Sequence, residues 1–264
     1  MLIKVLVNGA YGRMGQAVVK AVLEDKDLDL VGAVDIVGEG DAGETVGLPK
    51  CGVSFTRDLQ TTIDSVKPQV MVDFTIPDVV FGSAQVALKN KVAPVIGTTG
   101  LSDEQKQELA KLAEANDTPV FIAPNFAIGA VLMMQMAKQA AKYMPEVEII
   151  ELHHDKKLDA PSGTALQTAA LISEVRKAHV QGNPNEKEKV AGARGADVDG
   201  MHIHSVRLPG YVAHQEVIFG GLGQTLTIRH DSLNRESFMP GVCLAAKSIL
   251  GHKGLIIGLD KFMD

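Results

Sequence analysis

The chain has 264 residues, of which 45% are hydrophobic, 22% charged and 4% aromatic, and its formal net charge is -6. A chain of this length can bury a sizeable core in one large domain or in two moderate ones. An acidic chain without a basic tail is not expected to bind nucleic acid, and one without a run of about 18 apolar residues is not expected to cross a membrane.

The N-terminus leads from Met1 directly into a strand-and-turn pattern that ends at Asn8 and Gly9, which leaves no room for a signal peptide. The two cysteines, Cys51 and Cys243, lie far apart and have no C-x-x-C partner. Cysteines spaced in this way are typical of reduced structural residues. We therefore expect a cytoplasmic protein.

The first half of the chain alternates short apolar runs with helical segments. Residues 13–23 have one apolar face at helical spacing, and Ser102 and Gln105 have the spacing of a capping box that begins a helix ending near residue 114. Five apolar runs have the length and composition of buried parallel strands: 3–7, 30–34, 70–74, 93–96 and 119–122. Strands that alternate with helices predict an α/β fold with a Rossmann-like, doubly wound parallel sheet.

The pattern changes after Asn125. A helix is expected over 128–143, and its methionines, Met133, Met134 and Met136, are expected in the core. Further on come strand patterns, a helix and a polar loop: strands at 147–153, 202–208, 214–219 and 224–229, the helix from about Gly163 to Lys177, and the loop at 181–200. Consecutive strands joined by short turns predict antiparallel neighbours. We therefore expect a second domain of α+β type with a mostly antiparallel open sheet.

Glycine recurs in the pattern G-x-x-G-x-x-G at Gly9, Gly12 and Gly15, between the first strand and the first helix. Glycine is needed where a chain turns sharply and where its backbone approaches a pyrophosphate, and the start of a helix attracts phosphate. The position predicts a dinucleotide site. A tight turn without a ligand is the alternative.

Asp35 ends the second predicted strand. A carboxylate at this point can accept hydrogen bonds from the ribose hydroxyls and would repel a 2′-phosphate, which favours NADH. Ile36 supplies no compensating arginine, although Arg13 in the glycine turn could reach the phosphate, so some NADPH use is expected. The alternative is that Asp35 is a solvated strand cap.

Two further turns follow predicted strands, at residues 97–100 and at residues 123–126. The carboxyl ends of strands are where open α/β sheets bind their ligands. Together with the glycine turn, these segments predict the floor of a cofactor site. Each taken alone could be a plain turn.

The segment from Glu151 to Thr164 carries the residues best suited to chemistry. His153 and His154 can exchange protons near neutral pH, and Lys157 adds a positive donor. Gly163 and Thr164 open a predicted helix, whose first N–H groups can hold a carboxylate. Proton donors beside an anion site indicate chemistry on a small acidic substrate, whereas a surface loop with two histidines is the alternative.

Histidines also suggest a metal site as a competing use. His202 and His204 share one face of a predicted strand and could join His153 or His154 in a cluster. No cysteine or acid stands at a usual ligand spacing, so no metal is expected. His202 and His204 are instead expected to be core or interface residues, as are His214 and His230.

Two segments, Gly9–Gly15 and Glu151–Ala165, together resemble the bacterial 4-hydroxy-tetrahydrodipicolinate reductase family, formerly called dihydrodipicolinate reductase. Similar residues occur along nearly the whole chain, at 74–75, 97–100, 124–126, 204–210 and 214–216. The resemblance implies that a cyclic dicarboxylate loses water and is reduced by NADH or NADPH. The product, tetrahydrodipicolinate, feeds diaminopimelate and lysine synthesis.

The resemblance also implies roles for individual residues. His153 would be the proton donor or acceptor, Lys157 the proton donor and His154 a substrate ligand, with Gly163 and Thr164 holding one carboxylate. Family members form homotetramers through the sheet of the second domain. The matching cofactor residues are Gly9, Ala10, Tyr11, Gly12, Arg13, Met14, Asp35, Gly97, Thr98, Thr99, Ala123, Pro124, Asn125 and Phe126.

One departure concerns the cofactor. Many members carry an acid followed by arginine after the second strand, whereas this chain has Asp35 followed by Ile36. The departure leaves recognition of the 2′-phosphate, and with it the preference for NADPH, open.

We thus expect a dinucleotide-binding domain made of residues 1–126 and 240–264, with a substrate-binding and oligomerisation domain over 127–239. A helix is expected at 237–249, and the apolar segment 254–259 is expected to pack back onto the first domain. Bringing the domains together would place the nicotinamide over the substrate and exclude water.

Two other functions remain open. A dehydrogenase of the aspartate-semialdehyde type would share this plan, but its chemistry needs a cysteine nucleophile, and neither cysteine stands beside a histidine or strand-end motif. A redox sensor that binds NAD(H) would need no proton donors and would usually carry a DNA-binding element. This chain has the donors and lacks that element.

Overall fold

The computed structural model describes residues 2–177 and 179–263. The chain divides into two compact units, one formed by Met1–Ile128 with Arg235–Asp264 and the other by Gly129–Asn234. Within the described residues, no helix combines the length and the apolar character that crossing a membrane requires.

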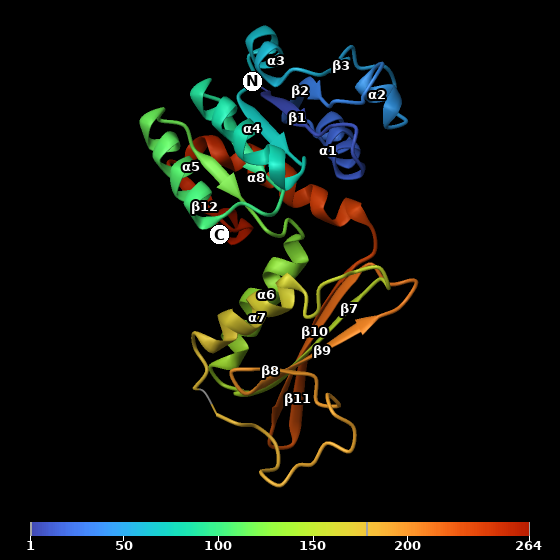
Figure 1. Ribbon diagram of the computed structural model, residues 1–264, viewed down its shortest axis with the longest axis vertical. Coiled ribbons are helices and arrows are strands. Elements are labelled where there is room, and N and C mark those ends of the chain that lie inside the picture. The colour runs from blue at the N-terminus through green and yellow to red at the C-terminus, as the bar shows by residue number, and fades with distance from the viewer. Residues whose placement is uncertain (1, 178, 264) are drawn as a thin grey trace. The chain divides into compact units, whose positions relative to one another are not determined.

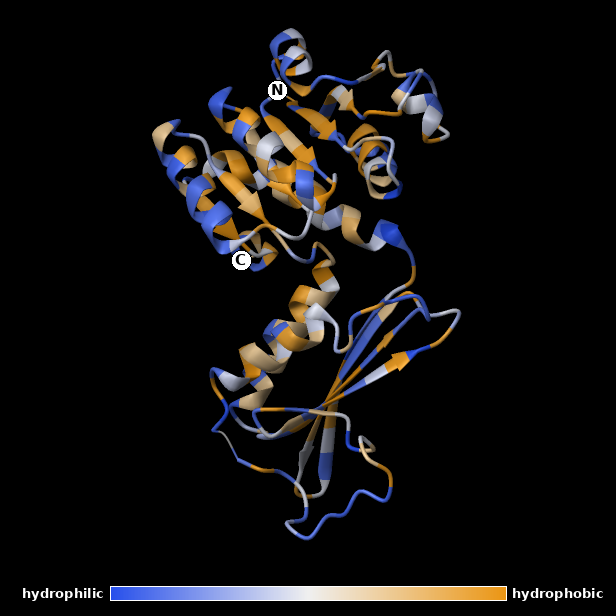
Figure 2. Ribbon diagram, viewed as in Figure 1, coloured by the Kyte–Doolittle hydropathy of each residue, from blue (hydrophilic) through white to orange (hydrophobic). Residues whose placement is uncertain are grey.

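The first unit is built on a seven-stranded parallel sheet in the order β12-β6-β5-β4-β1-β2-β3 (Figure 1). Its strands are β1 (Ile3–Asn8), β2 (Leu28–Val34), β3 (Phe55–Thr56), β4 (Val70–Asp73), β5 (Ala93–Ile96), β6 (Val120–Ile122) and β12 (Leu255–Ile257). Its α-helices are α1 (Arg13–Glu24), α2 (Ala42–Thr45), α3 (Leu59–Val66), α4 (Pro77–Lys89), α5 (Asp103–Ala115) and α8 (Met239–Ser248). The strands of this sheet are the most hydrophobic part of the unit in Figure 2, as burial on both faces requires.

The strand order reverses between β1 and β4. Helix α1 packs against α8, while α3 and α5 each pack against α4. Crossovers between parallel strands are right-handed, so α1, which leads from β1 to β2, lies on the opposite face from α3, α4 and α5, which connect strands in the other direction. Helix α8 joins α1 on its face. The loops that follow β1 and β4 therefore open at the point where such sheets bind ligands.

The sequence patterns of this unit are confirmed. Helix α5 begins with Ser102 as its N-cap, and the Ser102 and Gln105 side chains form the expected capping box. The C-terminal segment returns to the unit, where β12 pairs with β6. The doubly wound parallel sheet is thus present, and its edge strand comes from the C-terminal segment.

The second unit carries a five-stranded sheet in the order β11-β10-β7-β9-β8, with two helices (Figure 1). The strands are β7 (Glu146–His153), β8 (Ala196–Val198), β9 (Met201–Arg207), β10 (Ala213–Gly221) and β11 (Gln224–Ser232). The helices are α6 (Ile128–Ala141) and α7 (Gly163–Ser173). All strand pairs are antiparallel except β7 with β9, which confirms the expected mostly antiparallel sheet.

The expected pairing of the strands at 202–208 and 214–219 is wrong. Strand β7 lies between β9 and β10 and pairs with both. Alternate side chains of β7, Val147, Ile149 and Glu151, are buried. A strand with a fully buried face takes the centre of a sheet, where both of its edges are hydrogen-bonded.

Three smaller expectations also need correction. Met133 and Met134 are buried as expected, but Met136 is 54% exposed, because it lies about 200° around the helix axis from Met134. Helix α7 ends at Ser173, before the expected Lys177. The polar loop at 181–200 contains the short edge strand β8.

The close packing around Gly15, the third glycine of the turn, can be tested by substitution. A Cβ at Gly15 would lie 2.0 Å from the Gly9 carbonyl oxygen, whereas a Cβ at Gly82, within α4, would meet nothing within 4 Å. We expect Gly15→Ala to lower the melting temperature, since overpacking costs about 1–3 kcal/mol. Gly82→Ala is the control and should stabilise by about 0.5–1 kcal/mol, measured by thermal unfolding. An unchanged melting temperature for Gly15→Ala would contradict this close contact.

Candidate functional site

The glycine turn lies where β1 ends and α1 begins. Gly9 has a φ of +77°, and a Cβ there would lie 2.6 Å from the carbonyl oxygen of Phe74, so the position requires glycine. Gly12 is the N-cap of α1, and among the described residues no side chain caps this helix. The first N–H groups of α1 therefore remain available to an anion such as a phosphate.

Asp35 is hydrogen-bonded to the glycine turn as well as to its own loop. Its Oδ2 accepts from the backbone N of Tyr11 at 2.9 Å, and its Oδ1 accepts from that of Val37 at 3.2 Å. A pocket of about 380 Å³ opens beside it, and Gly9 and Gly12 are part of its wall. These features fit the nucleoside half of a dinucleotide, since they combine a backbone phosphate site with a carboxylate.

The turns after β4 and β5 are joined by a buried acid. Asp73 is fully buried and accepts hydrogen bonds from Asn8 Nδ2 at 2.8 Å, Thr98 Oγ1 at 2.8 Å and Thr75 Oγ1 at 2.8 Å. Burial raises the pKa of Asp73, and the hydrogen bonds from Thr75, Asn8 and Thr98 oppose that rise. Thr98, which the sequence suggested for the cofactor floor, therefore also positions this turn.

The remaining predicted cofactor residues differ in exposure. Ala10, Ala123 and Phe126 are buried, and the Phe126 ring packs against Phe74 and Phe121. The exposed or partly exposed side chains are those of Tyr11, Arg13, Met14, Thr99, Pro124 and Asn125. The buried members can contribute to a ligand site through backbone groups and by supporting the loops.

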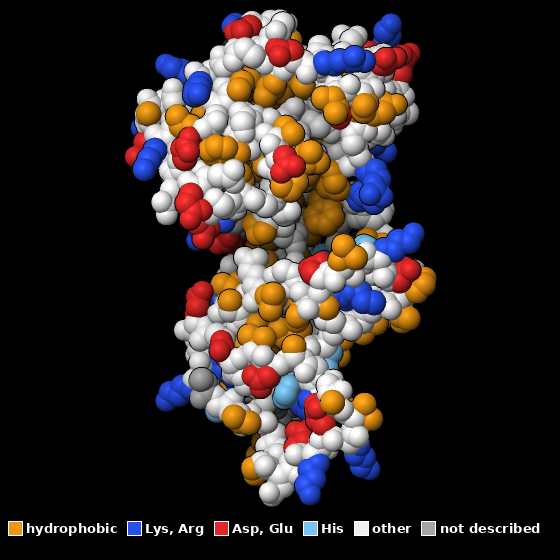
Figure 3. Space-filling view, viewed as in Figure 1, with side chains coloured by type: hydrophobic (Ala, Val, Ile, Leu, Met, Phe, Trp, Pro, Cys, Tyr) orange, Lys and Arg blue, Asp and Glu red, His pale blue; other side chains and the backbone are white. Residues whose placement is uncertain are grey.

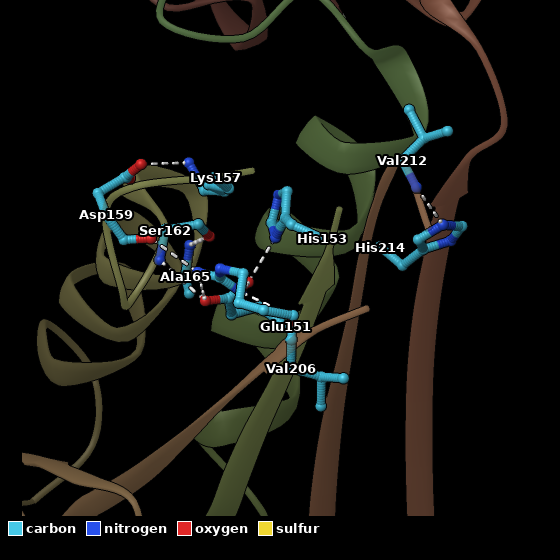
Figure 4. Close-up of polar contacts among 10 residues, drawn as sticks. Glu151, His153, Lys157, Asp159, Ser162, Ala165, Val206, Val212 and His214 are labelled. Carbon is cyan, nitrogen blue, oxygen red and sulfur yellow. Dashed lines mark hydrogen bonds and ion pairs between the residues drawn. The ribbon is translucent and has the colours of Figure 1, made fainter. Parts of the chain in front are cut away.

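The second unit centres its candidate site on Glu151, whose side chain is fully buried. Its two oxygens accept from Arg207 Nη1 at 2.8 Å and Nη2 at 2.7 Å, a bidentate pair. His153 Nδ1 also bonds Glu151 Oε2, and the Ser162 backbone N donates to Oε1 at 3.2 Å (Figure 4). One carboxylate thus joins β7, β9 and the start of α7.

The charge state of Glu151 follows from these partners. Burial acts to raise its pKa, but hydrogen bonds from His153, Arg207 and Ser205 outweigh burial and lower the pKa to about 2. An ionised carboxylate only accepts hydrogen bonds, so Nδ1 of His153 must carry the proton. The other ring nitrogen, Nε2, is then the one that can accept or donate a proton in a reaction.

Lys157 lies in the loop after β7, and its Nζ donates to Asp159 Oδ1 at 2.7 Å (Figure 4). The same loop is fixed by Arg207, because Nη2 also donates to the Asp159 carbonyl at 2.7 Å. The Lys157 side chain is 21% exposed, whereas Lys156 is exposed. One arginine therefore fixes both the Glu151 carboxylate and the loop that carries Lys157.

The start of α7 is formed as predicted. Ser162 is its N-cap and accepts from the Ala165 backbone N at 3.2 Å. Gly163 is exposed, with open space beside its Cα, and Thr164 follows it in the first turn. His154 lies just beyond the end of β7 and is exposed, so it shares no strand face with His153.

Other histidines take part in local pairs. His214 Nδ1 bonds Asp231 Oδ1 at 2.5 Å. Its Nε2 accepts from the Val212 backbone N at 3.2 Å (Figure 4). His204 Nε2 bonds Glu148 Oε2 at 2.8 Å. Within the part of the chain that the structure describes, no group of three or more His, Cys, Asp or Glu side chains could hold a metal ion.

Sequence reasoning missed Glu151 and Arg207 as members of the site. Glu151 stood two residues before His153, so on a strand both share one face, and this spacing was the available signal. Arg207 pairs in register with His153 across the β7–β9 ladder, which no local pattern reveals. Asp73 was missed as well, although an acid that ends an apolar run is an unusual residue to bury.

The fold defines a class: two-unit oxidoreductases with a Rossmann-like nucleotide-binding unit and a separate α+β unit. The family models named dihydrodipicolinate reductase, N-terminus and C-terminus, match residues 3–126 and 129–263. The chain belongs to the dihydrodipicolinate reductase family.

Relatives and solved structures agree with this assignment. The chain is 54% identical to the 4-hydroxy-tetrahydrodipicolinate reductase of Desulfitobacterium hafniense, with 99% of each covered, and 53% identical to that of Halalkalibacterium halodurans, with 100% of each covered. A dipicolinate-bound dihydrodipicolinate reductase from Paenisporosarcina sp. is 50% identical, covers 99% of each chain and has a TM-score of 0.89. An amine dehydrogenase from Mycobacterium smegmatis, at 14% identity and a TM-score of 0.68, shares the fold alone.

The ion pair between Glu151 and Arg207 should make the free energy of unfolding depend on pH in acid. Because the folded pKa of Glu151, about 2, lies below its ordinary value of 4.5, its contribution is complete above pH 4.5 and is lost as the pH falls towards 2. We expect Glu151→Gln to destabilise the protein by about 3–5 kcal/mol at pH 7, since Arg207, whose side chain is only 19% exposed, would lose its charged partner. The variant should also lose this part of the pH dependence, measured by chemical denaturation from pH 7 down to 3.

Asp155→Asn, an exposed carboxylate in the loop after β7, is the matched control and should behave like the unmodified protein. Equal stability of Glu151→Gln and Asp155→Asn at pH 7 would refute a structural role for the ion pair.

Proposed function

We propose that this chain reduces 4-hydroxy-tetrahydrodipicolinate, with loss of water, to tetrahydrodipicolinate, using NADH or NADPH. The observation that carries the proposal is the anchored His153, whose Nδ1 is bound to a buried carboxylate beside the Lys157 loop. Family membership supports the substrate, because relatives named for this reaction match over their full length.

The chemistry requires a hydride and a proton. A bound reduced nicotinamide would supply the hydride to the conjugated imine of the dehydrated substrate. The negative charge that then develops must be met by a proton, and a positioned acid typically accelerates such a step by about 10²–10⁴-fold. We assign this acid–base work to His153 Nε2 and to Lys157 Nζ.

Each assignment has a physical basis. Glu151 fixes the orientation and the tautomer of the His153 ring, as carboxylates do for imidazoles that act as general acids or bases. Lys157 has only the exposed carboxylate of Asp159 as its ion-pair partner among the described residues. An ion pair with one solvent-exposed partner is weak, so substrate can displace Asp159 from Lys157 at little cost.

Carboxylate binding falls to the start of α7 and to His154. The N–H groups of Gly163 and Thr164 lie in the first turn of a helix, where anions are favoured. A solved relative carries dipicolinate, a cyclic dicarboxylate, which supports a substrate with two carboxylates. The net charge of -6 does not attract an anionic substrate to the protein as a whole. Acidic and basic side chains are mixed over the face seen in Figure 3. The local donors must therefore hold the substrate.

The nucleotide is assigned to the first unit. We propose contacts from residues 9–14, Asp35, residues 97–99 and residues 123–126, with the uncapped start of α1 holding the pyrophosphate. NADH is favoured by Asp35. A homotetramer formed through the second unit's sheet, in the cytoplasm, is part of the same proposal and is tested by sedimentation velocity.

The surroundings of the two cysteines argue against a dehydrogenase of the aspartate-semialdehyde type. Burial raises the pKa of Cys243 to about 11, which leaves its thiol protonated at neutral pH. Cys51 Sγ donates a hydrogen bond to Asp41 Oδ1 at 3.5 Å, so this sulfur is engaged in a local structural contact. Neither sulfur is suited to acyl transfer, and the reductase proposal needs none.

The acid–base roles predict a selective kinetic defect. His153→Ala and Lys157→Ala should each lower kcat at least about a hundredfold while NADH binding is retained. Lys156→Ala removes the neighbouring exposed charge and should keep near-normal turnover. The assay follows the loss of absorbance of the reduced nicotinamide with substrate generated by a coupled synthase, and normal kcat in the first two variants would remove those residues from the mechanism.

The cofactor preference predicts a second outcome. Asp35→Asn keeps an oxygen that can accept from Tyr11 but removes the charge that opposes a 2′-phosphate. We expect the ratio of NADPH to NADH affinity to rise about tenfold, which corresponds to about 1.4 kcal/mol. Affinities are measured by isothermal titration, and equal loss with both nucleotides would argue that Asp35 does not discriminate between them.

A further inference from the structure

Arg57 occupies a position that the sequence alone did not associate with the nucleotide. Strand β3 pairs in parallel with β2, Val34 opposite Thr56, and the Asp35 backbone N donates to the Thr56 carbonyl at 2.9 Å. The residue after Thr56 therefore emerges at the same edge of the sheet as Asp35 and Ile36. Arg57, which follows strand β3, therefore lies beside position 36, which follows strand β2 and is occupied here by Ile36.

The pocket beside Asp35 includes Arg57 in its wall. Much of the remaining lining is apolar and includes Ile36, Leu59, Ile76 and Val79, beside the polar side chains of Asn8, Thr75 and Ser83. Ile36, Ile76 and Val79 are among the exposed large hydrophobic residues of the chain. Apolar walls with a single guanidinium and a carboxylate at the rim suit a flat base joined to a charged sugar.

The guanidinium of Arg57 is weakly held. Its ion-pair partner among the described residues is Glu39, with Arg57 Nη2 and Glu39 Oε1 3.6 Å apart. The two side chains are 70% and 84% exposed, so the pair contributes little and is easily exchanged. A phosphate, with two oxygens for a bidentate contact, is a stronger partner for arginine than this distant carboxylate.

We propose that Arg57 binds the 2′-phosphate of NADPH and so gives this chain use of both nicotinamide nucleotides. The inference rests on the proposed nucleotide site. The guanidinium supplies from β3 the positive charge that Ile36 does not supply from β2. The N–H groups of Tyr11 and Val37, which donate to Asp35, reduce the repulsion that this carboxylate exerts on the phosphate.

Arg57 could instead stack on the adenine ring, as arginines often do on flat π systems. Stacking would favour NADH and NADPH equally, because both carry the same base. A phosphate contact would favour NADPH alone. The comparison of the two nucleotides therefore separates the two uses.

The experiment is isothermal titration of the full-length protein with NADH and NADPH, and with the fragments 5′-AMP and 2′,5′-ADP. We expect Arg57→Ala to weaken NADPH and 2′,5′-ADP by about 10–100-fold and to leave NADH and 5′-AMP within about twofold. Glu39→Gln frees the guanidinium and should tighten NADPH by about two- to fivefold, with no change for NADH. Lys89→Ala, an exposed cation at the end of α4, is the control for net charge and should change neither.

Three results would overturn the inference. Equal weakening of both nucleotides by Arg57→Ala would assign the residue to the base, and no weakening would remove it from the site. Loss of NADPH binding in Arg13→Ala with none in Arg57→Ala would give the phosphate to the glycine turn. If the unmodified protein binds neither nucleotide nor either fragment, the proposed function fails with it.

Discussion

The candidate site depends on one buried carboxylate. Glu151 has no exposure to solvent, yet its pKa lies near 2, because a bidentate arginine, an imidazole and a backbone N–H surround it. A buried charge is tolerated only with such complete pairing. The partners come from β7, β9 and the start of α7, so the interaction that compensates the charge also holds these three segments together.

In the first unit a buried acid is also held by hydrogen bonds, but its pKa changes in the opposite direction. Asp73 is equally buried and joins the ends of β1, β4 and β5 through neutral donors, so its pKa is raised rather than lowered. Asp35 is nearer the surface and links the end of β2 to the glycine turn. In both units, acids at strand ends hold loops at the edge where ligands are expected.

Sequence reasoning reached the features that local patterns encode. The strands of the parallel sheet, the Ser102 capping box, the glycine turn and the Ser162 helix start all depend on residues near one another in the chain. The failures concern long-range pairing: Arg207 and Glu151 are 56 positions apart, and the central place of β7 depends on which strands lie beside it. Arg57 could not be predicted as a neighbour of Asp35 either, because the two lie close together only through the pairing of β2 with β3.

The crowding around Glu151 has a consequence for the imidazole it holds. Each carboxylate oxygen already receives two N–H groups, and the side chain is sealed from water. The proton on Nδ1 of His153 is thereby shielded from exchange with bulk solvent. Only the other ring nitrogen, Nε2, is left for proton exchange, so a proton that joins or leaves the ring must do so at that atom.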